Sequence, residues 1–178
     1  GNAYPWGIEL QLVAYQPGRV EESVSGFVTN LMQSVLVVIG VMLMFLGLRT
    51  GLVVASLIPM AVLLTFVVMS MFGIGLDRMS LAALIIALGM LVDNAIVMVE
   101  NIQVLSAQGV SRRDAAMQSA RELRVPLLTS SMTTAAAFLP IFLAESTVGE
   151  YTAPLFKVLT IALLSSWVLS LTMVPLLC

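Results

Sequence analysis

Long stretches without charge constrain this chain more than any other feature of its sequence. Residues 23–48 and 51–73 contain no charged side chain, and the run over residues 79–99 is interrupted only by Asp93. Further apolar runs follow near the carboxyl end. About 20 apolar residues suffice to cross the hydrocarbon core of a membrane as a helix. The pattern therefore predicts an all-α polytopic membrane protein, a bundle of five transmembrane helices at about residues 23–48, 51–73, 79–101, 125–144 and 151–176.

Composition excludes most other classes of protein. Hydrophobic residues make up 60% of the chain and charged residues 10%, against roughly 25% charged in an ordinary soluble domain. The net charge of −2 gives no overall field that would attract a nucleic acid. The chain has no histidine, and its single cysteine is the last residue, Cys178. We therefore expect no metal site, no disulfide framework and no cofactor.

The first residues of the chain follow a different pattern. Apolar side chains alternate with small or polar ones at Trp6, Ile8, Leu10 and Leu12. This period of two predicts a short extracytoplasmic strand, which cannot be stable alone. We expect residues 1–18 to be the tail of an extracytoplasmic domain and residues 19–178 to form the helical bundle. Because both ends of the chain look cut, we also expect a fragment of a longer protein.

A polar segment, at about residues 110–124, precedes the fourth predicted span. Ser111, followed three residues later by Asp114, fits the capping box that begins a helix. Arginines then alternate with alanines and leucine, which predicts a short cytoplasmic amphipathic helix on the membrane surface. A solvated connector fits the same pattern equally well. Pro126 is expected in the first turn of the span that follows.

The positions of the basic residues predict the orientation. Arg49 and the four arginines of residues 112–124 belong to alternate loops, whereas Arg78 and Lys157 lie on the other side. Cytoplasmic loops carry an excess of lysine and arginine. We therefore place the five arginines in the cytoplasm and the amino-terminal segment outside it.

Asp93 is the residue of the apolar runs that most clearly indicates chemistry. It follows the start of its run by about 14 residues, or about 21 Å of helix, well inside a core about 30 Å thick. An aspartate at that depth costs on the order of 3 kcal/mol. We therefore expect it to face the bundle interior. Burial favours the neutral carboxyl and a nearby cation favours the charged form, so such a group can load and release a proton. A structural aspartate that only fixes helix packing is the alternative.

Four other polar residues are candidates for supporting roles. Asn94 adds a polar group about 100° around the helix. Glu100 lies two turns beyond Asp93, nearly on the same face, and is expected to reach the cytoplasmic interface. Thr133 and Thr134 give the fourth span a polar face that could line a water wire, although such hydroxyls more often bond to a carbonyl one turn earlier. The chain has no glycine-rich phosphate loop and no nucleophile–base pair, so we expect a transporter and not an enzyme.

The most specific stretch is LDRMSLAALIIALGMLVDNAIVMVENI, at residues 76–102. It resembles the fourth transmembrane helix of the resistance–nodulation–division (RND) efflux transporters of the hydrophobe/amphiphile, or acriflavine resistance, type. Three further stretches match that family in order: FLGLRTGLVVASLIPMAVLLTF, SRRDAAMQSARELRVPLLTSSMTTAAAFLPIFL and LTMVPLLC. The resemblance covers nearly the whole chain and equates its spans with helices two to six of the first six-helix repeat.

The resemblance implies a proton antiporter of the bacterial inner membrane that exports drugs, other amphiphiles or metal ions. It implies a homotrimer with a periplasmic adaptor and an outer-membrane channel, and it makes residues 1–18 the tail of the periplasmic porter domain. Asp93 would be the proton-relay carboxylate, with Asn94 holding it or its waters. The family often has a second Asp where this chain has Asn94, so the number of protons per cycle stays open. The family's basic partner lies on a helix of the second repeat, outside this chain.

Two other functions remain open at this stage. A protein-export accessory or lipid exporter could share the helical repeat, and a small extracytoplasmic domain would favour it. A structural membrane module without transport activity is the second possibility. Asp93 would then be permanently ionised and paired, or permanently neutral.

Overall fold

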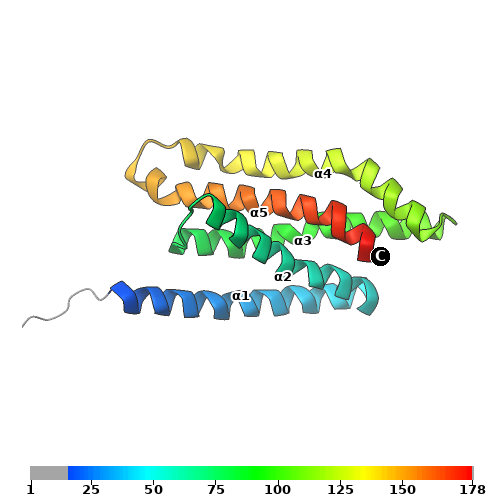
Figure 1. Ribbon diagram of the computed structural model, residues 1–178, viewed down its shortest axis with the longest axis horizontal. Helices are drawn as coiled ribbons and strands as arrows, with labels where there is room; N and C mark the ends of the chain where they lie inside the picture. The colour runs from blue at the N-terminus through cyan, green and yellow to red at the C-terminus, as the bar shows by residue number, and fades with distance from the viewer. Residues whose placement is uncertain (1–15, 178) are drawn as a thin grey trace, which may run out of the picture.

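The computed structural model describes residues 16–177 and consists of five long α-helices joined by short turns (Figure 1). The helices are α1 (Gln16–Leu46), α2 (Leu48–Met71), α3 (Arg78–Ala107), α4 (Arg112–Leu143) and α5 (Thr147–Leu177). Each of them is long and apolar enough to cross a membrane. The predicted all-α polytopic fold with five spans is therefore confirmed. The predicted amino-terminal strand falls on residues outside the described part of the chain.

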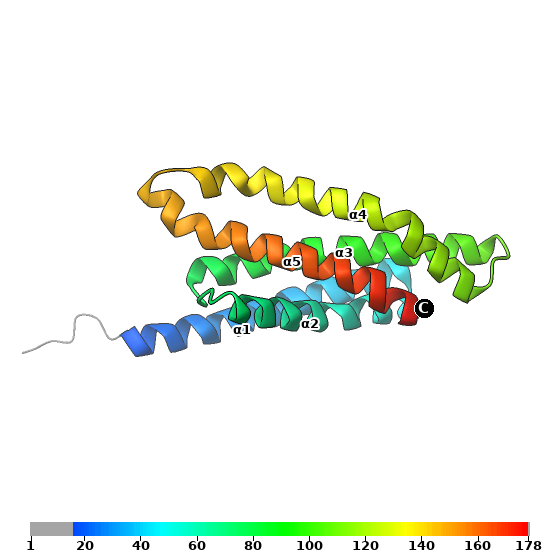
Figure 2. The ribbon, with the colours of Figure 1, turned by 45° about the horizontal axis from the view of Figure 1, so that its top comes forward.

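Helix α3 lies at the centre of the bundle and contacts each of the other four helices. Helices α4 and α5 lie side by side, and α1 occupies the opposite edge, where it packs only on α2 and α3 (Figures 1 and 2). Many apolar side chains of α1 remain exposed, among them Leu36, Val37, Met44 and Phe45. Such an exposed apolar face suits lipid or a further helix far better than water.

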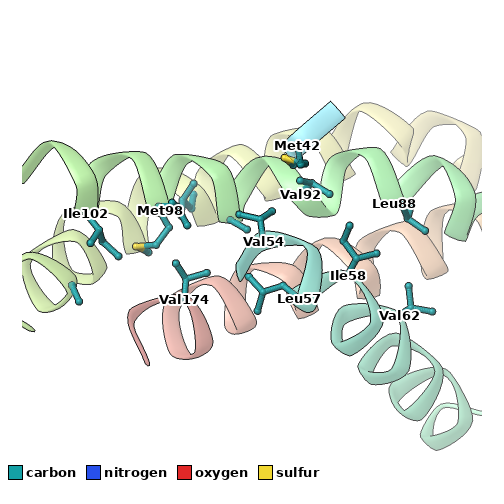
Figure 3. Packing of buried hydrophobic residues seen from close by; sticks show 14 of the residues in the cluster. Met42, Val54, Leu57, Ile58, Val62, Leu88, Val92, Met98, Ile102 and Val174 are labelled. Atoms are coloured by element: carbon teal, nitrogen blue, oxygen red, sulfur yellow. The ribbon is translucent and has the colours of Figure 1, made fainter. Parts of the chain in front are cut away.

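Small and branched side chains allow the other helices to approach α3 closely. Ala83 and Ala87 of α3 have no exposed surface, and small residues at such positions let helix backbones come together. Larger side chains complete the core on the same helix. Figure 3 shows Leu88, Val92, Met98 and Ile102 of α3 facing Val54, Leu57 and Ile58 of α2 and Val174 of α5.

The structure differs from the sequence prediction at the start of the fourth span. Ser111 caps the helix as expected: its hydroxyl accepts the Asp114 backbone N–H at 3.2 Å and donates to the Asp114 carboxylate at 2.6 Å. The amphipathic segment predicted at residues 110–124 is not a separate helix, however. It is the first part of α4, which continues to Leu143.

Pro126 lies inside α4 rather than in a first turn. A proline within a helix removes one backbone hydrogen bond and bends the helix instead of ending it when tertiary contacts compensate. Figure 1 shows α4 bending between its amino-terminal part and the rest of the helix. The indole N–H of Trp167 in α5 donates to the carbonyl of Arg124 at 2.8 Å. This bond anchors α5 to the backbone two residues before Pro126.

The turn between α1 and α2 depends on two glycines. Gly47 has φ 82° and ψ 168°, a backbone conformation that is essentially restricted to glycine. Four residues later, a Cβ built on Gly51 would lie 3.0 Å from the Leu43 side chain and 3.2 Å from its Cα. Both glycines let α2 fold back tightly along α1.

We expect Gly47→Ala to lower the stability of the full-length protein by about 1–3 kcal/mol, the usual cost of a side chain in such a backbone conformation. The measurement is the thermal unfolding midpoint in detergent. Gly40→Ala is the matched control, because Gly40 lies within α1 and its Cβ would meet nothing within 4 Å. Equal midpoints for the two variants would show that the turn tolerates a side chain.

Candidate functional site

Asp93 lies close to the middle of α3. It follows Arg78, the first residue of the helix, by 15 residues, or about 22 Å at the rise of an α-helix. Its predicted position along one continuous helix is therefore seen. The predicted direction of its side chain is not, because Asp93 is exposed among the described residues whereas its neighbours Val92 and Asn94 are buried. The expectation that Asp93 faces the interior of these five helices is wrong, since other residues of α3 occupy that face.

Asp93 lines an open groove of about 350 Å³ between α1 and α3. The α1 wall is wholly apolar: it consists of Val37, Val38, Val41, Met42, Phe45 and Leu46. On the α3 side, Gly89 lies one turn before Asp93, and Glu100 lies two turns after it in the same groove. The predicted sharing of a face by Asp93 and Glu100 is thus seen in the structure. No lysine or arginine belongs to the described lining of this groove.

Asn94 points away from the groove and fastens α3 to α4. Its Nδ2 donates to the Ser131 hydroxyl at 3.3 Å. Both side chains are buried, with exposed fractions of 6% and 4%. Consecutive residues of a helix are rotated by about 100°, which explains why Asn94 and Asp93 serve different neighbours.

A second hydrogen bond holds the same stretch of α3 to α5. The Ser166 hydroxyl donates to the carbonyl of Leu91 at 2.6 Å, and the serine is buried. Farther along, Asn101 Nδ2 donates to the Ser119 hydroxyl of α4 at 3.1 Å. These contacts were not predicted from the sequence. Hydroxyls at Ser165, Ser166 and Ser170 of an apolar run were the available signal, but they do not reveal a partner.

Thr133 and Thr134 do not join the groove. Their hydroxyls donate to the carbonyls of Thr129 and Ser130, one turn earlier in α4, at 2.8 and 3.0 Å. This bond to a carbonyl one turn earlier is the alternative to a water wire that is common for such hydroxyls. The site that the structure assembles therefore contains Asp93 and Glu100 in the groove and Asn94 behind it.

The described residues contain no group of three or more histidine, cysteine, aspartate or glutamate side chains able to hold a metal ion. What the groove offers chemically is one mid-span carboxylate, in an apolar wall, with a second carboxylate near its end. Such a residue inside a membrane bundle is typical of an ion or substrate pathway. Fold and site together define a polytopic helical membrane protein with an intramembrane carboxylate groove.

The family follows from comparison with known proteins. Residues 2–178 match the model of the AcrB/AcrD/AcrF family, and the chain belongs to this family of RND efflux transporters. It is 33% identical over 177 residues to the multidrug resistance protein MdtC of Escherichia coli O139:H28. It is likewise 33% identical over 175 residues to MdtC of Pantoea ananatis. Both matches cover 98% of this chain but 17% of the relative, so the chain spans about a sixth of their length.

A solved structure supports the same assignment. The crystal structure of a heavy metal efflux pump superposes with a TM-score of 0.73 at 29% sequence identity. The superposition covers 90% of this chain and 16% of that one. The arrangement of the five helices is thus that of part of a known efflux transporter.

We expect Ser131→Ala to destabilise the full-length protein, because it leaves the buried Asn94 amide without its partner. Interhelical hydrogen bonds in membrane proteins contribute on average about 0.6 kcal/mol, with a maximum near 1.7. Thermal unfolding in detergent measures the effect, and Ser130→Ala, on the exposed side of α4, is the control. If both variants unfold at the same temperature, the Asn94–Ser131 bond does not contribute to helix packing.

Proposed function

We propose that this chain forms part of the membrane domain of a proton-driven efflux pump that exports drugs or other amphiphiles, with Asp93 as the proton-relay carboxylate. One observation carries the proposal. Asp93 lies at mid-span in an open groove whose described lining is apolar except for the carboxylates of Asp93 and Glu100. Ionisable residues at that depth are costly and mark ion or proton pathways more often than packing contacts.

The energetics favour a group that changes its protonation state. A charged aspartate at the bilayer centre costs on the order of 3 kcal/mol on insertion scales. The groove can meet this cost in two ways: Asp93 binds a proton, or a cation approaches from a helix that covers the groove. When the two states are close in free energy, a proton gradient shifts the balance between them. The change of charge then alters how the covering helix packs, which couples proton movement to conformation.

The contacts behind Asp93 suit this role. Asn94 is bonded to α4 and the carbonyl of Leu91 is bonded to Ser166 of α5. Both bonds lie on the side of α3 opposite the groove, and they fix this segment of the helix to α4 and α5. A change of charge at Asp93 therefore acts on whatever covers the groove. Glu100 is proposed as the cytoplasmic mouth of the path. Thr133 and Thr134 do not line the groove.

We place the protein in the bacterial inner membrane, with the amino-terminal segment in the periplasm. Arg49 and Arg112 lie at the same end of the bundle, and the other three arginines of α4 follow in its first half. The excess of arginine supports a cytoplasmic location for this end. Membership of the family supports a homotrimer that works with a periplasmic adaptor and an outer-membrane channel.

The cargo is proposed from the similarity to relatives. The MdtC proteins are named for multidrug resistance, and the solved structure is titled a heavy metal efflux pump. We favour drugs and other amphiphiles, because the multidrug relatives share the higher sequence identity with this chain. Metal ions are the second cargo class that the similar proteins suggest.

We expect Asp93→Asn in the full-length protein to reduce efflux to the level of cells that lack the transporter. The amide keeps the size of the side chain but cannot bind and release a proton. The measurements are drug susceptibility and dye efflux in whole cells, with membrane content and oligomer size checked on the same samples. Asp77→Asn makes the same chemical change in the turn before α3 and should leave efflux intact.

Full efflux by a well-assembled Asp93→Asn variant would contradict the proposal. The carboxylate would then be structural, and the proton path would lie elsewhere in the protein. A structural membrane module predicts this second outcome.

A further inference from the structure

A second cavity, of about 220 Å³, opens at the end of the bundle where α1 turns into α2. Helices α2, α3, α4 and α5 all contribute to it. Two arginines line it, Arg49 near the start of α2 and Arg112 at the start of α4. These arginines are 63 positions apart in the sequence, and the fold brings them to one cavity.

The charge of the cavity is uncompensated within its described lining. Arg49 and Arg112 are its only charged residues there, and no aspartate or glutamate accompanies them. Arg49 is the second residue of α2 and Arg112 is the first residue of α4. The carboxyl-terminal ends of α3 and α5 border the same cavity through Ser106 and Leu177, so the positive charge comes from the arginine side chains and not from the helix dipoles. The remaining polar groups include Thr50 and Gln103, whose side chains are joined by a hydrogen bond of 2.6 Å.

The rest of the wall is apolar. Val53, Val99, Ile102 and Leu177 also line the cavity. Val53 lies one turn farther along α2 than Arg49, and Val99 and Ile102 lie at least one turn before Ser106 in α3. A ligand that fits both sets of residues has an anionic head and a hydrocarbon tail. Free phosphate would use only the arginines and would leave the apolar wall in contact with water.

We propose that this cavity binds the phosphate headgroup of an anionic phospholipid. Arginine presents its N–H groups in a planar fork that matches two phosphate oxygens. Basic cavities between transmembrane helices on the cytoplasmic side are suited to anionic lipid headgroups. The volume of 220 Å³ exceeds that of several water molecules at about 30 Å³ each, enough for a phosphate. A bound lipid would bridge four helices, whether or not Asp93 carries a proton.

The test uses the full-length protein in nanodiscs or detergent, with native mass spectrometry to count bound phosphatidylglycerol against phosphatidylcholine. The pair Arg49→Gln and Arg112→Gln removes both charges from the cavity. The matched pair Arg113→Gln and Arg121→Gln removes two exposed charges of α4 that do not line it. Each basic residue near an anionic lipid strengthens binding about fivefold, so the cavity pair should bind phosphatidylglycerol roughly 25-fold more weakly. The matched pair should stay close to wild type.

A third variant distinguishes loss of the lipid site from misfolding of the double mutant. Ser106→Phe fills the cavity from α3 and keeps both arginines. It should displace phosphatidylglycerol while the oligomer and the helix content remain unchanged. Loss of bound phosphatidylglycerol in Ser106→Phe, but not in the matched arginine pair, would support the proposed lipid site.

Three results would overturn it. Equal losses in the cavity pair and the matched pair would show that surface charge alone retains the lipid. Unchanged binding in the cavity pair, or in Ser106→Phe, would show that the cavity is not the site. Displacement of the lipid from wild type by millimolar inorganic phosphate would show that the arginines bind free phosphate and that the apolar wall contributes nothing.

Discussion

The absence of water from a hydrocarbon layer governs how α3 is built and how the other helices pack around it. Each backbone group there needs a partner within the protein, and a helix supplies nearly all of them. The polar side chains then need partners on neighbouring helices. Asn94 finds one in Ser131 of α4, and Ser166 of α5 finds one in the carbonyl of Leu91. Asp93 is the exception at this depth, because the described lining of its groove provides apolar groups and a second carboxylate.

This exception divides α3 into two faces with different tasks. One face is packed with small and branched side chains against α2, α4 and α5, and Ala83, Ala87 and Met98 have no exposed surface. The other face carries Asp93 toward the open groove beside α1. A close-packed face changes shape only at high cost, whereas the groove beside α1 is open. Under the proposed function, a change of charge on Asp93 would alter packing on this side of the bundle only, as a coupling device requires.

The sequence predicted the five helices well, but it did not predict the direction in which the Asp93 side chain points from α3. Both results have physical reasons. Runs without charge identify spans because the membrane excludes charge from them, and the depth of Asp93 follows from the fixed rise of a helix. Pro126 misled the prediction for α4, because a proline that starts a helix and one that bends it look alike in sequence. The direction of Asp93 depends on which helix covers which face of α3. That arrangement is set by long-range packing, which residue spacing and composition do not reveal. For the same reason, the sequence did not predict the serines that bond to Asn94 and to the Leu91 carbonyl.

Infrared difference spectroscopy observes directly whether the Asp93 carboxyl binds and releases a proton during transport, as we propose. The full-length protein is reconstituted in proteoliposomes, and spectra are recorded with and without an imposed proton gradient. We predict a carbonyl band of a protonated carboxylic acid that changes with the gradient and is absent from Asp93→Asn. A spectrum with the same gradient-dependent bands in wild type and Asp93→Asn would contradict the claim, because Asp93 would then keep one protonation state throughout the cycle.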